Sequence, residues 1–364
     1  MDLTLCLTHD CNLACRYCYA GRKRPASMER ETAAAALELA FDQAASGEMQ
    51  VSFFGGEPLM EWDTLTWATR WGEEMAVQRG IDLLLTVTTN GTRLTDDRVS
   101  WLADHGFAIA VSIDGDRVSH DRARLRRDGG SSFDATLAGL LRALARSPNT
   151  EAIFVVTPDN VDQVFEGTRF LADQGVRCIS LNPDFYAGWS DDQLATLEAQ
   201  YALAADLFVE RFRAGGDLYL NFVDGKILTR LKGGFSCADR CSFGEGEIAV
   251  APTGRIYPCE RLVGDDTGEL SIGHVRKGFD ELSRLALIAK RGNHDADCAT
   301  CAVRERCMNW CGCINHATTG AIDRVSALVC FHEQLCIREA DRAAEVLWRE
   351  RDPLFLRKYY REGT

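Results

Sequence analysis

Short apolar runs alternate with stretches of helical periodicity along the first half of the chain. Strands that alternate with helices are typical of βα units, whose parallel sheet is covered by helices on one face and by a packed interior on the other. The sequence therefore predicts an α/β fold. We predict strands at 3–8, 51–56, 83–90, 108–114, 152–157 and 178–183, and helices near 29–46, 61–79, 95–105, 134–146 and 162–174.

Six βα units are too few for a complete eight-stranded barrel, so the pattern leaves a partial barrel or an open doubly wound sheet. In both folds the functional residues gather in the loops that follow the carboxyl ends of the strands. The unusual residues of this chain lie in such loops, where glycines let the backbone approach a ligand closely. These loops read THDCNLACRYC (8–18), GGEPL (55–59), TTNGT (88–92) and SIDGD (112–116).

The second half of the chain has a different texture. Residues 190–232 predict a helix, a loop and a strand, with a short strand and turn at 217–225. From Ser236 onward, cysteines and short turns replace the periodicity, so we expect this segment to depend on metal clusters to fold. The stretch 333–361 is charged and helical in pattern.

Composition narrows the class of protein. The 364 residues suffice for one large domain with an appendage or for two domains, and the formal net charge of −13 disfavours nucleic acid as a partner. No apolar run approaches the roughly 20 residues of a membrane span, and the first residues read as a strand rather than a signal peptide. We therefore expect a cytoplasmic protein without membrane contacts. One basic stretch holds Arg122, Arg124, Arg126 and Arg127, and its simplest interpretation is a solvated loop face.

The 15 cysteines are far more than a chain of this size normally carries. Disulfides would explain them in a secreted protein, but in a reducing compartment clustered spacings favour metal or iron–sulfur ligation. The cysteines are indeed clustered, at 11–18 and between 237 and 330. Those outside the two groups are Cys6, Cys178 and Cys336.

Cys11, Cys15 and Cys18 have the spacing CxxxCxxC. Most cysteine-built metal sites use four thiolates, and this loop offers three. Three thiolates can hold three irons of a [4Fe–4S] cluster and leave the fourth iron open to a ligand that carries an adjacent amine and carboxylate. The alternatives are a zinc site completed by His9 or a remote cysteine, and a redox CxxC pair.

These motifs, each after its own strand, together resemble the radical S-adenosylmethionine (SAM) enzymes. The resemblance implies that SAM takes the fourth place on the cluster. It further implies that Glu57 and the GGE backbone engage the methionine amino group, and that Ser112 and Arg124, twelve residues apart, hold its carboxylate. The SAM-binding residues implied in this way are Tyr17, Gly55, Gly56, Glu57, Asn90, Ser112 and Arg124.

The cysteine-rich tail alone is also compatible with structural zinc knuckles. Beside the first half, it resembles the SPASM extension of peptide-modifying radical SAM enzymes, which implies two auxiliary [4Fe–4S] clusters and three in all. By position, the first would be held by Cys237, Cys241, Cys259 and Cys311, and the second by Cys298, Cys301, Cys307 and Cys330. Cys313 would replace a ligand or pack nearby.

The resemblance also implies a domain plan. A partial (β/α)6 TIM-like barrel would be followed by a connector, a cysteine-rich SPASM domain and a C-terminal helix. The expected bounds are 1–189, 190–235, 236–336 and 337–364.

The implied reaction starts with cleavage of SAM to a 5′-deoxyadenosyl radical, which removes a hydrogen atom from the substrate. An auxiliary cluster would then accept an electron and a base a proton. Glu260 matches the position of the family's base, although a surface carboxylate paired with Arg261 is the simpler interpretation. Asp224 matches a second acidic position and would orient substrate.

The expected function is therefore a peptide maturase that forms an oxidative modification or a cross-link. A sulfatase-type maturase is the alternative, although Ala20 and Phe54 depart from the pattern of that branch. Small-molecule radical SAM dehydrogenases and a non-catalytic zinc or iron–sulfur protein are further options. Expected partners are a peptide or protein substrate, a separate peptide-recognition protein, and a low-potential electron donor of the flavodoxin or ferredoxin type. The sequence does not define the peptide, the modification or the oligomeric state.

Overall fold

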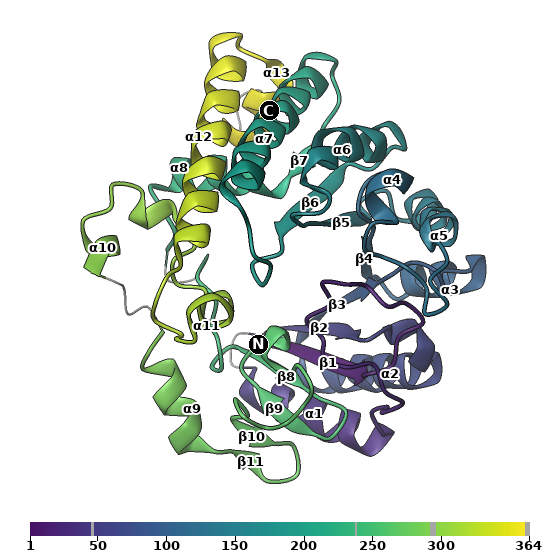
Figure 1. Ribbon diagram of the computed structural model, residues 1–364. Helices are drawn as coiled ribbons and strands as arrows, with labels where there is room; N and C mark the ends of the chain where they lie inside the picture. The colour runs from purple at the N-terminus through teal and green to yellow at the C-terminus, as the bar shows by residue number, and fades with distance from the viewer. Residues whose placement is uncertain (45–46, 237–238, 292–295, 361–364) are drawn as a thin grey trace. The chain divides into compact units, whose positions relative to one another are not determined.

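The computed structural model describes residues 1–44, 47–236, 239–291 and 296–360, which form two compact units (Figure 1). The first unit comprises Met1–Val111, Arg124–Ser147 and Cys241–Arg291. The second unit comprises Ser112–Ala123, Pro148–Arg240 and Gly292–Thr364.

A sheet of parallel and antiparallel strands forms the core of the first unit. The predicted parallel strands are present as β1 (Asp2–Thr8), β2 (Glu48–Gly55), β3 (Asp82–Thr89) and β4 (Ala108–Ser112), side by side in that order. Leu5 of β1 stands opposite Phe53 of β2, and both side chains are buried. The helical elements of this unit are α1 (Arg30–Gln43), η1 (Pro58–Glu61), α2 (Trp62–Arg79), α3 (Asp96–Asp104), α5 (Phe133–Arg146), η4 (Glu260–Leu262) and α9 (Glu281–Ile288).

The cysteine-rich tail contributes to the same sheet. β8 (Glu247–Val250) pairs parallel with β1, and β9 (Arg255–Tyr257), β10 (Gly273–His274) and β11 (Gly278–Phe279) continue outward from it. Ala249, Tyr257 and Val263 pack with Cys6 in a buried cluster. Residues 247–263 therefore pack on apolar surface that β1 supplies, and the expected dependence of the segment on metal clusters stays a prediction.

The second unit carries three parallel strands and the two longest of the described helices. β5 (Glu151–Val156), β6 (Cys178–Pro183) and β7 (Tyr219–Leu220) pair in that order, and α12 (Ala327–Arg349) packs along α7 (Asp191–Arg213) and α8 (Asn221–Lys232). A capping box between Ser190 and Gln193 starts α7. The other helical elements are α4 (Arg117–His120), η2 (Val161–Gln163), α6 (Val164–Asp173), α10 (Ala296–Ala299), η5 (Arg304–Arg306), α11 (Gly312–Thr319) and α13 (Pro353–Tyr360).

Two local predictions are wrong. The strand and turn expected at 217–225 are a two-residue strand followed at once by α8, because the Asp224 carboxylate accepts the Leu220 N–H and closes the first helical turn. The single C-terminal helix is two helices, since α12 ends at Arg349 and α13 starts at Pro353, a residue favoured at a helix start. Among the described helices, none combines the length and apolar content of a membrane span.

The compact units do not follow the expected domain bounds. Residues 247–279 belong with the first strands because β8 pairs with β1. The functional division at 189/190, 235/236 and 336/337 stays a prediction.

Candidate functional site

The loop after β1, residues 9–26, carries the first three clustered cysteines and is called the cluster loop below. The side chains of Thr8 and Asp10 shape its start: Thr8 Oγ1 accepts the Asp10 N–H over 3.0 Å, and Asp10 Oδ1 accepts the Cys11 N–H over 2.9 Å. Cys11 is buried, Cys15 is half-buried and Cys18 is exposed. A side-chain turn of this kind holds the backbone where strand pairing has ended.

N–H groups point at the sulfurs of this loop. Cys11 Sγ accepts from the Leu13 N–H over 3.4 Å and from Asn90 Nδ2 over 3.7 Å, while Lys23 Nζ lies 3.0 Å from Cys18 Sγ. Burial raises the pKa of the Cys11 thiol, so a thiolate there requires a nearby cation. Three cysteines on one loop, two of whose sulfurs accept hydrogen bonds, fit a cluster that carries negative charge on its sulfur atoms.

The GGE segment lies directly against the cluster loop. The Gly56 N–H donates to Thr8 O over 2.7 Å and the Glu57 N–H to Asp10 O over 2.8 Å. A Cβ on Gly56 would lie 1.9 Å from Asp10 O, so only glycine allows this approach. In the structure, the glycine at position 56 allows a close approach to the backbone of Asp10. The contact of these glycines with SAM stays a prediction.

Glu57 is fully buried and joins two of the motif loops. Its carboxylate accepts from the Leu59 N–H over 3.0 Å, from Thr89 Oγ1 over 2.7 Å and from the Asn90 N–H over 2.8 Å. Burial raises the pKa of Glu57 although these donors oppose the shift. In the structure, Glu57 thus connects the GGE loop to the TTNGT loop. Its contact with the methionine amino group stays a prediction.

Asn90 connects the TTNGT loop to the cluster loop. Its Nδ2 donates to Asn12 Oδ1 over 2.9 Å, and its Oδ1 accepts from Thr92 Oγ1 over 2.6 Å. Asn12 Nδ2 donates in turn to Thr92 Oγ1 over 2.8 Å. Sequence reasoning missed Asn12 and Thr92 as site residues, although both lie inside the motifs that it singled out.

The basic stretch is not a uniform solvated face. Arg124 is 5% exposed, and its guanidinium lies 5.2 Å from the centre of the Tyr17 ring. Arg126 is exposed and pairs with Asp128, whereas Arg127 pairs with Asp10 of the cluster loop. Ser112 ends β4 and belongs to the second unit, so its predicted partnership with Arg124 stays a prediction.

The first unit brings two tail cysteines together with two carboxylates. The Cys241 thiol donates to Glu247 Oε2 over 3.2 Å, and the Cys259 thiol donates to Glu260 Oε2 over 3.2 Å. The ligand atoms of Glu247, Cys259 and Glu260 lie within 4.8 Å of one another. Glu260 therefore lies beside the predicted cluster ligand, and the guanidinium of Arg261 lies 4.8 Å from the Tyr19 ring.

Glu247 is the residue that sequence reasoning missed here. Burial and then the neighbouring Glu260 carboxylate raise its pKa to about 7. Its signal in the sequence is a charged residue at the start of the apolar run EIAV. Cys237, predicted as a ligand beside Cys241, lies outside the described residues, and Cys311 belongs to the second unit.

The other tail cysteines lie in the second unit on short, successive turns. The Cys301 N–H donates to Cys298 O, the Cys307 N–H to Arg304 O and the Cys311 N–H to Met308 O. Cys330 is in the first turn of α12 and is exposed, and buried Cys313 has its sulfur 3.5 Å from that of Cys311. An all-thiol donor set on tight turns fits iron–sulfur ligation, and the division into two clusters stays a prediction.

A buried ion pair holds the Cys307 turn. Lys226 Nζ lies 2.7 Å from Glu333 Oε2 and donates to Arg306 O over 3.0 Å, while the Met308 N–H donates to the same Glu333 oxygen. Burial, followed by the Glu333 charge, raises the pKa of Cys307 to about 12. As with Cys11, nearby positive charge would favour a thiolate at Cys307.

Asp224, the second predicted catalytic carboxylate, is buried by α13. It accepts from the Leu220 N–H over 2.8 Å, from Lys358 Nζ over 2.9 Å and from Tyr359 OH. Burial raises its pKa although Lys358 opposes the shift. These contacts fix the C-terminal helix, and a role in orienting substrate stays a prediction.

A family model described as the radical SAM superfamily matches residues 5–186, which include the cluster loop and every predicted SAM-binding residue. This chain belongs to the radical SAM superfamily. Membership implies a [4Fe–4S] cluster and SAM, as the cluster loop led us to expect.

Two curated relatives match this radical SAM protein along most of its length. The serine-type anaerobic sulfatase-maturating enzyme of Klebsiella aerogenes is 24% identical over 342 residues, covering 86% of this chain and 80% of the relative. The PqqA peptide cyclase of Gluconobacter oxydans is 26% identical over 385 residues, covering 99% and 98%.

Solved structures share the fold. The structure of native anSMEcpe with bound AdoMet has a TM-score of 0.77 at 19% identity and covers 95% of this radical SAM protein and 98% of that chain. Streptococcus suis SuiB bound to the precursor peptide SuiA has a TM-score of 0.65 at 17% identity, covering 90% and 75%. The predicted fold class is confirmed.

Proposed function

We propose that this radical SAM enzyme acts on a ribosomally made peptide or protein and forms an oxidative modification or a cross-link. The observation that carries the proposal is the cluster loop of this superfamily member, on which N–H groups donate to the sulfurs of Cys11 and Cys18. Relatives named for PqqA cyclisation and for sulfatase maturation support a peptide or protein substrate.

Cys11, Cys15 and Cys18 would hold the first [4Fe–4S] cluster, with SAM at its open iron. When bound, the pair supplies a carbon radical that can remove a hydrogen atom from an unactivated C–H bond. Lys23 and Asn90 would stabilise negative charge on the cysteine sulfurs. Buried Arg124 would pair with the methionine carboxylate, because a guanidinium fits a carboxylate in two-point geometry.

The tail cysteines would hold two auxiliary clusters, each with four thiolates, which suits electron transfer. After loss of a hydrogen atom, the substrate would lose one proton and one electron, a two-electron oxidation overall. Glu260, beside Cys259, would accept the proton. A flavodoxin- or ferredoxin-type donor would supply the electron that starts each turnover.

Formylglycine formation is the second candidate, and the sulfatase-maturating relatives support it. Two residues separate this chain from the pattern of that branch, Ala20 and Phe54. Phe54 stacks with Tyr19 at 6.2 Å and an interplanar angle of 17°, beside the cluster loop. Peptide assays therefore have to include both reaction types.

The test starts with anaerobic reconstitution. Three clusters predict about twelve irons per chain, and Ala at Cys11, Cys15 and Cys18 should remove about four and abolish release of 5′-deoxyadenosine. Zinc in the tail of a protein that retains activity would contradict the auxiliary clusters. Peptides encoded beside the gene, and a sulfatase-type Cys or Ser peptide, are then analysed by mass spectrometry. An aldehyde-reactive probe distinguishes formylglycine from a cross-link.

A further inference from the structure

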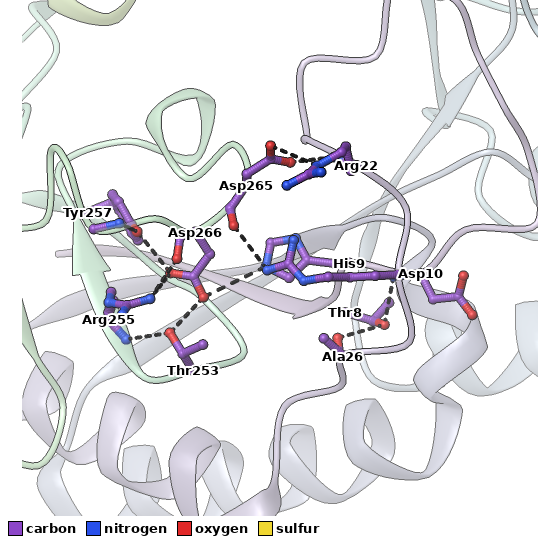
Figure 2. Close-up of polar contacts among 12 residues, drawn as sticks. Thr8, His9, Asp10, Arg22, Ala26, Thr253, Arg255, Tyr257, Asp265 and Asp266 are labelled. Atoms are coloured by element: carbon purple, nitrogen blue, oxygen red, sulfur yellow. Dashed lines mark hydrogen bonds and ion pairs between the residues drawn. The ribbon is translucent and has the colours of Figure 1, made fainter.

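The turn Gly264–Asp266 follows Cys259 and η4 in the chain and contacts the cluster loop more than 200 residues away in sequence, within the first unit (Figure 2). The cluster loop is closed at its base, where the His9 N–H donates to Ala26 O over 2.9 Å and Thr8 Oγ1 donates to the same oxygen over 3.1 Å. The turn contacts both sides of this base. On the outgoing side, where the loop leaves β1, it contacts His9. On the returning side, where the loop leads back to Ala26, it contacts Gly21, Arg22 and Arg24.

On the returning side, the two backbones are in direct contact. A Cβ on Gly21 would lie 2.4 Å from Gly264 O and 2.6 Å from Asp265 Oδ1, and Gly21 has φ +74°. Any other residue at position 21 must therefore displace the turn or the loop. The turn and the cluster loop are therefore complementary in shape at this contact.

Asp265 binds the residues that follow Gly21. Its Oδ1 accepts the Arg22 N–H over 2.6 Å, its Oδ2 lies 3.3 Å from Arg22 Nε, and its backbone carbonyl accepts from Arg24 over 3.0 Å. These contacts hold the chain just beyond Cys18. A displacement of the turn would therefore move the segment that carries Lys23, the donor to Cys18 Sγ.

On the outgoing side, Asp266 faces His9 from a buried position. Its Oδ2 lies 3.8 Å from His9 Nε2, an ion-pair distance that is too long for a hydrogen bond. The same carboxylate accepts from Thr253 Oγ1 over 2.6 Å and from Tyr257 OH over 2.8 Å. Burial alone would raise the pKa of Asp266, but His9, Thr253, Tyr257 and Arg255 together hold it at about 2.

The backbone of Asp266 is also unusual, with φ 55°. A residue with a side chain adopts this left-handed conformation at a cost, and such a residue persists only where its surroundings determine it. The surroundings here are Thr253, Arg255 and Tyr257, from β9 and the turn before it. The carboxylate is thus fixed by the strand that leads to Cys259.

We propose that Gly264–Asp266 is a positioning turn, which fixes the cluster loop to the segment that carries Cys259. The proposal rests on the proposed function, in which Cys259 is an auxiliary-cluster ligand. Asp266 is a positioning residue, since the described contacts of its carboxylate are with His9, Thr253, Tyr257 and Arg255 and it would act on the cluster loop through His9. Disturbing the turn should therefore alter how SAM binds at the first cluster without removing any cysteine.

Gly21→Ala and Asp266→Asn test this in the reconstituted full-length enzyme. Asn tolerates the left-handed conformation, so Asp266→Asn keeps the backbone and removes the negative charge together with one of the two acceptor oxygens. Gly106→Ala is the matched control, because Gly106 has φ +70° and no atom within 4 Å of an added Cβ. The control carries the same backbone strain without the contact.

The readouts are iron content, SAM affinity, and the change that SAM causes in the electron paramagnetic resonance (EPR) spectrum of the reduced first cluster. Gly21→Ala and Asp266→Asn should bind SAM about tenfold more weakly and alter the SAM-dependent spectrum, with auxiliary-cluster signals retained. Gly106→Ala should match wild type.

The outcomes separate cleanly. Wild-type SAM affinity and spectra in Asp266→Asn would overturn the positioning role, and this variant decides if Gly21→Ala does not fold. If wild-type protein holds a single cluster, the part of the proposed function that assigns Cys259 to an auxiliary cluster fails, while the comparison of Asp266→Asn with wild type still decides whether the turn positions the cluster loop.

Discussion

Lys23 Nζ donates a hydrogen bond to the sulfur of Cys18 across 3.0 Å, whereas the sulfur of Cys11 accepts from two uncharged donors, the Leu13 N–H and the Asn90 amide. A positive charge beside a cluster sulfur favours the reduced cluster, which carries one more negative charge. Hydrogen bonds to sulfur and net charge are main determinants of iron–sulfur reduction potentials.

Lys23→Gln should therefore lower the reduction potential of the first cluster. We expect a decrease of about 60 mV, which is a tenfold change in the one-electron equilibrium. An EPR-monitored redox titration of the reconstituted enzyme measures it. Lys277→Gln, an exposed lysine of the same unit, is the control. Equal potentials in the two variants would show that the contact with Cys18 has no electrostatic effect.

Arg124→Ala should weaken SAM binding about ten- to a hundredfold, since a charge-assisted contact to a carboxylate is worth about 1.5–3 kcal/mol. Arg126→Ala is matched in sequence and charge, but Arg126 is exposed and paired with Asp128, so its loss should change little. Equilibrium dialysis with SAM measures both. Similar affinities in the two variants would refute the assignment of Arg124.

The sequence predicted those parts of the fold and site that are local. The first six strands, Cys11–Cys18, the GGE loop and Asn90 each lie within a few residues of a recognisable strand end, and the structure has those strands in place. Within each unit the order of these strands along the chain is also their order in the sheet, because consecutive parallel strands are neighbours.

The residues that the sequence did not reveal depend on pairing between distant segments. Glu247 and Asp266 approach the first half only because β8 pairs with β1, and nothing in a run such as EIAV specifies that partner. The first residues of α8, 221–225, form a helix instead of the expected turn because the Asp224 cap and the packing of α12 against α8 outweigh the glycine at 225.

Glu333→Gln should destabilise the second unit, because Lys226 would remain buried without a counter-charge. The side chains of the pair are 8% and 4% exposed, and breaking such a pair costs about 3–5 kcal/mol. Urea unfolding of the reconstituted enzyme measures the loss, and iron content should fall with it because Glu333 also holds the turn beside Cys307.

The control for the buried pair is Glu350→Gln, whose partner Arg213 is half exposed, and its free energy of unfolding should change by less than about 1 kcal/mol. If the two variants unfold at the same urea concentration, the Lys226–Glu333 pair contributes no more than a surface pair. If the second unit of Glu333→Gln retains its iron, the Lys226–Glu333 pair is not needed to hold the cysteine turns.

Glu260→Gln should separate radical formation from product formation. The Glu260 carboxylate contacts Cys259 Sγ, so a base there would accept the substrate proton beside the predicted electron acceptor. General-base assistance is typically worth about 10² to 10⁴ in rate, and Gln keeps the size of the side chain but cannot take a proton. We expect wild-type SAM binding and iron content, product formation at least about tenfold slower, and continued release of 5′-deoxyadenosine.

The control is Glu269→Gln, which changes an exposed carboxylate of the same segment and should behave as wild type. Product formation at the wild-type rate in Glu260→Gln would mean that the proton leaves by another route.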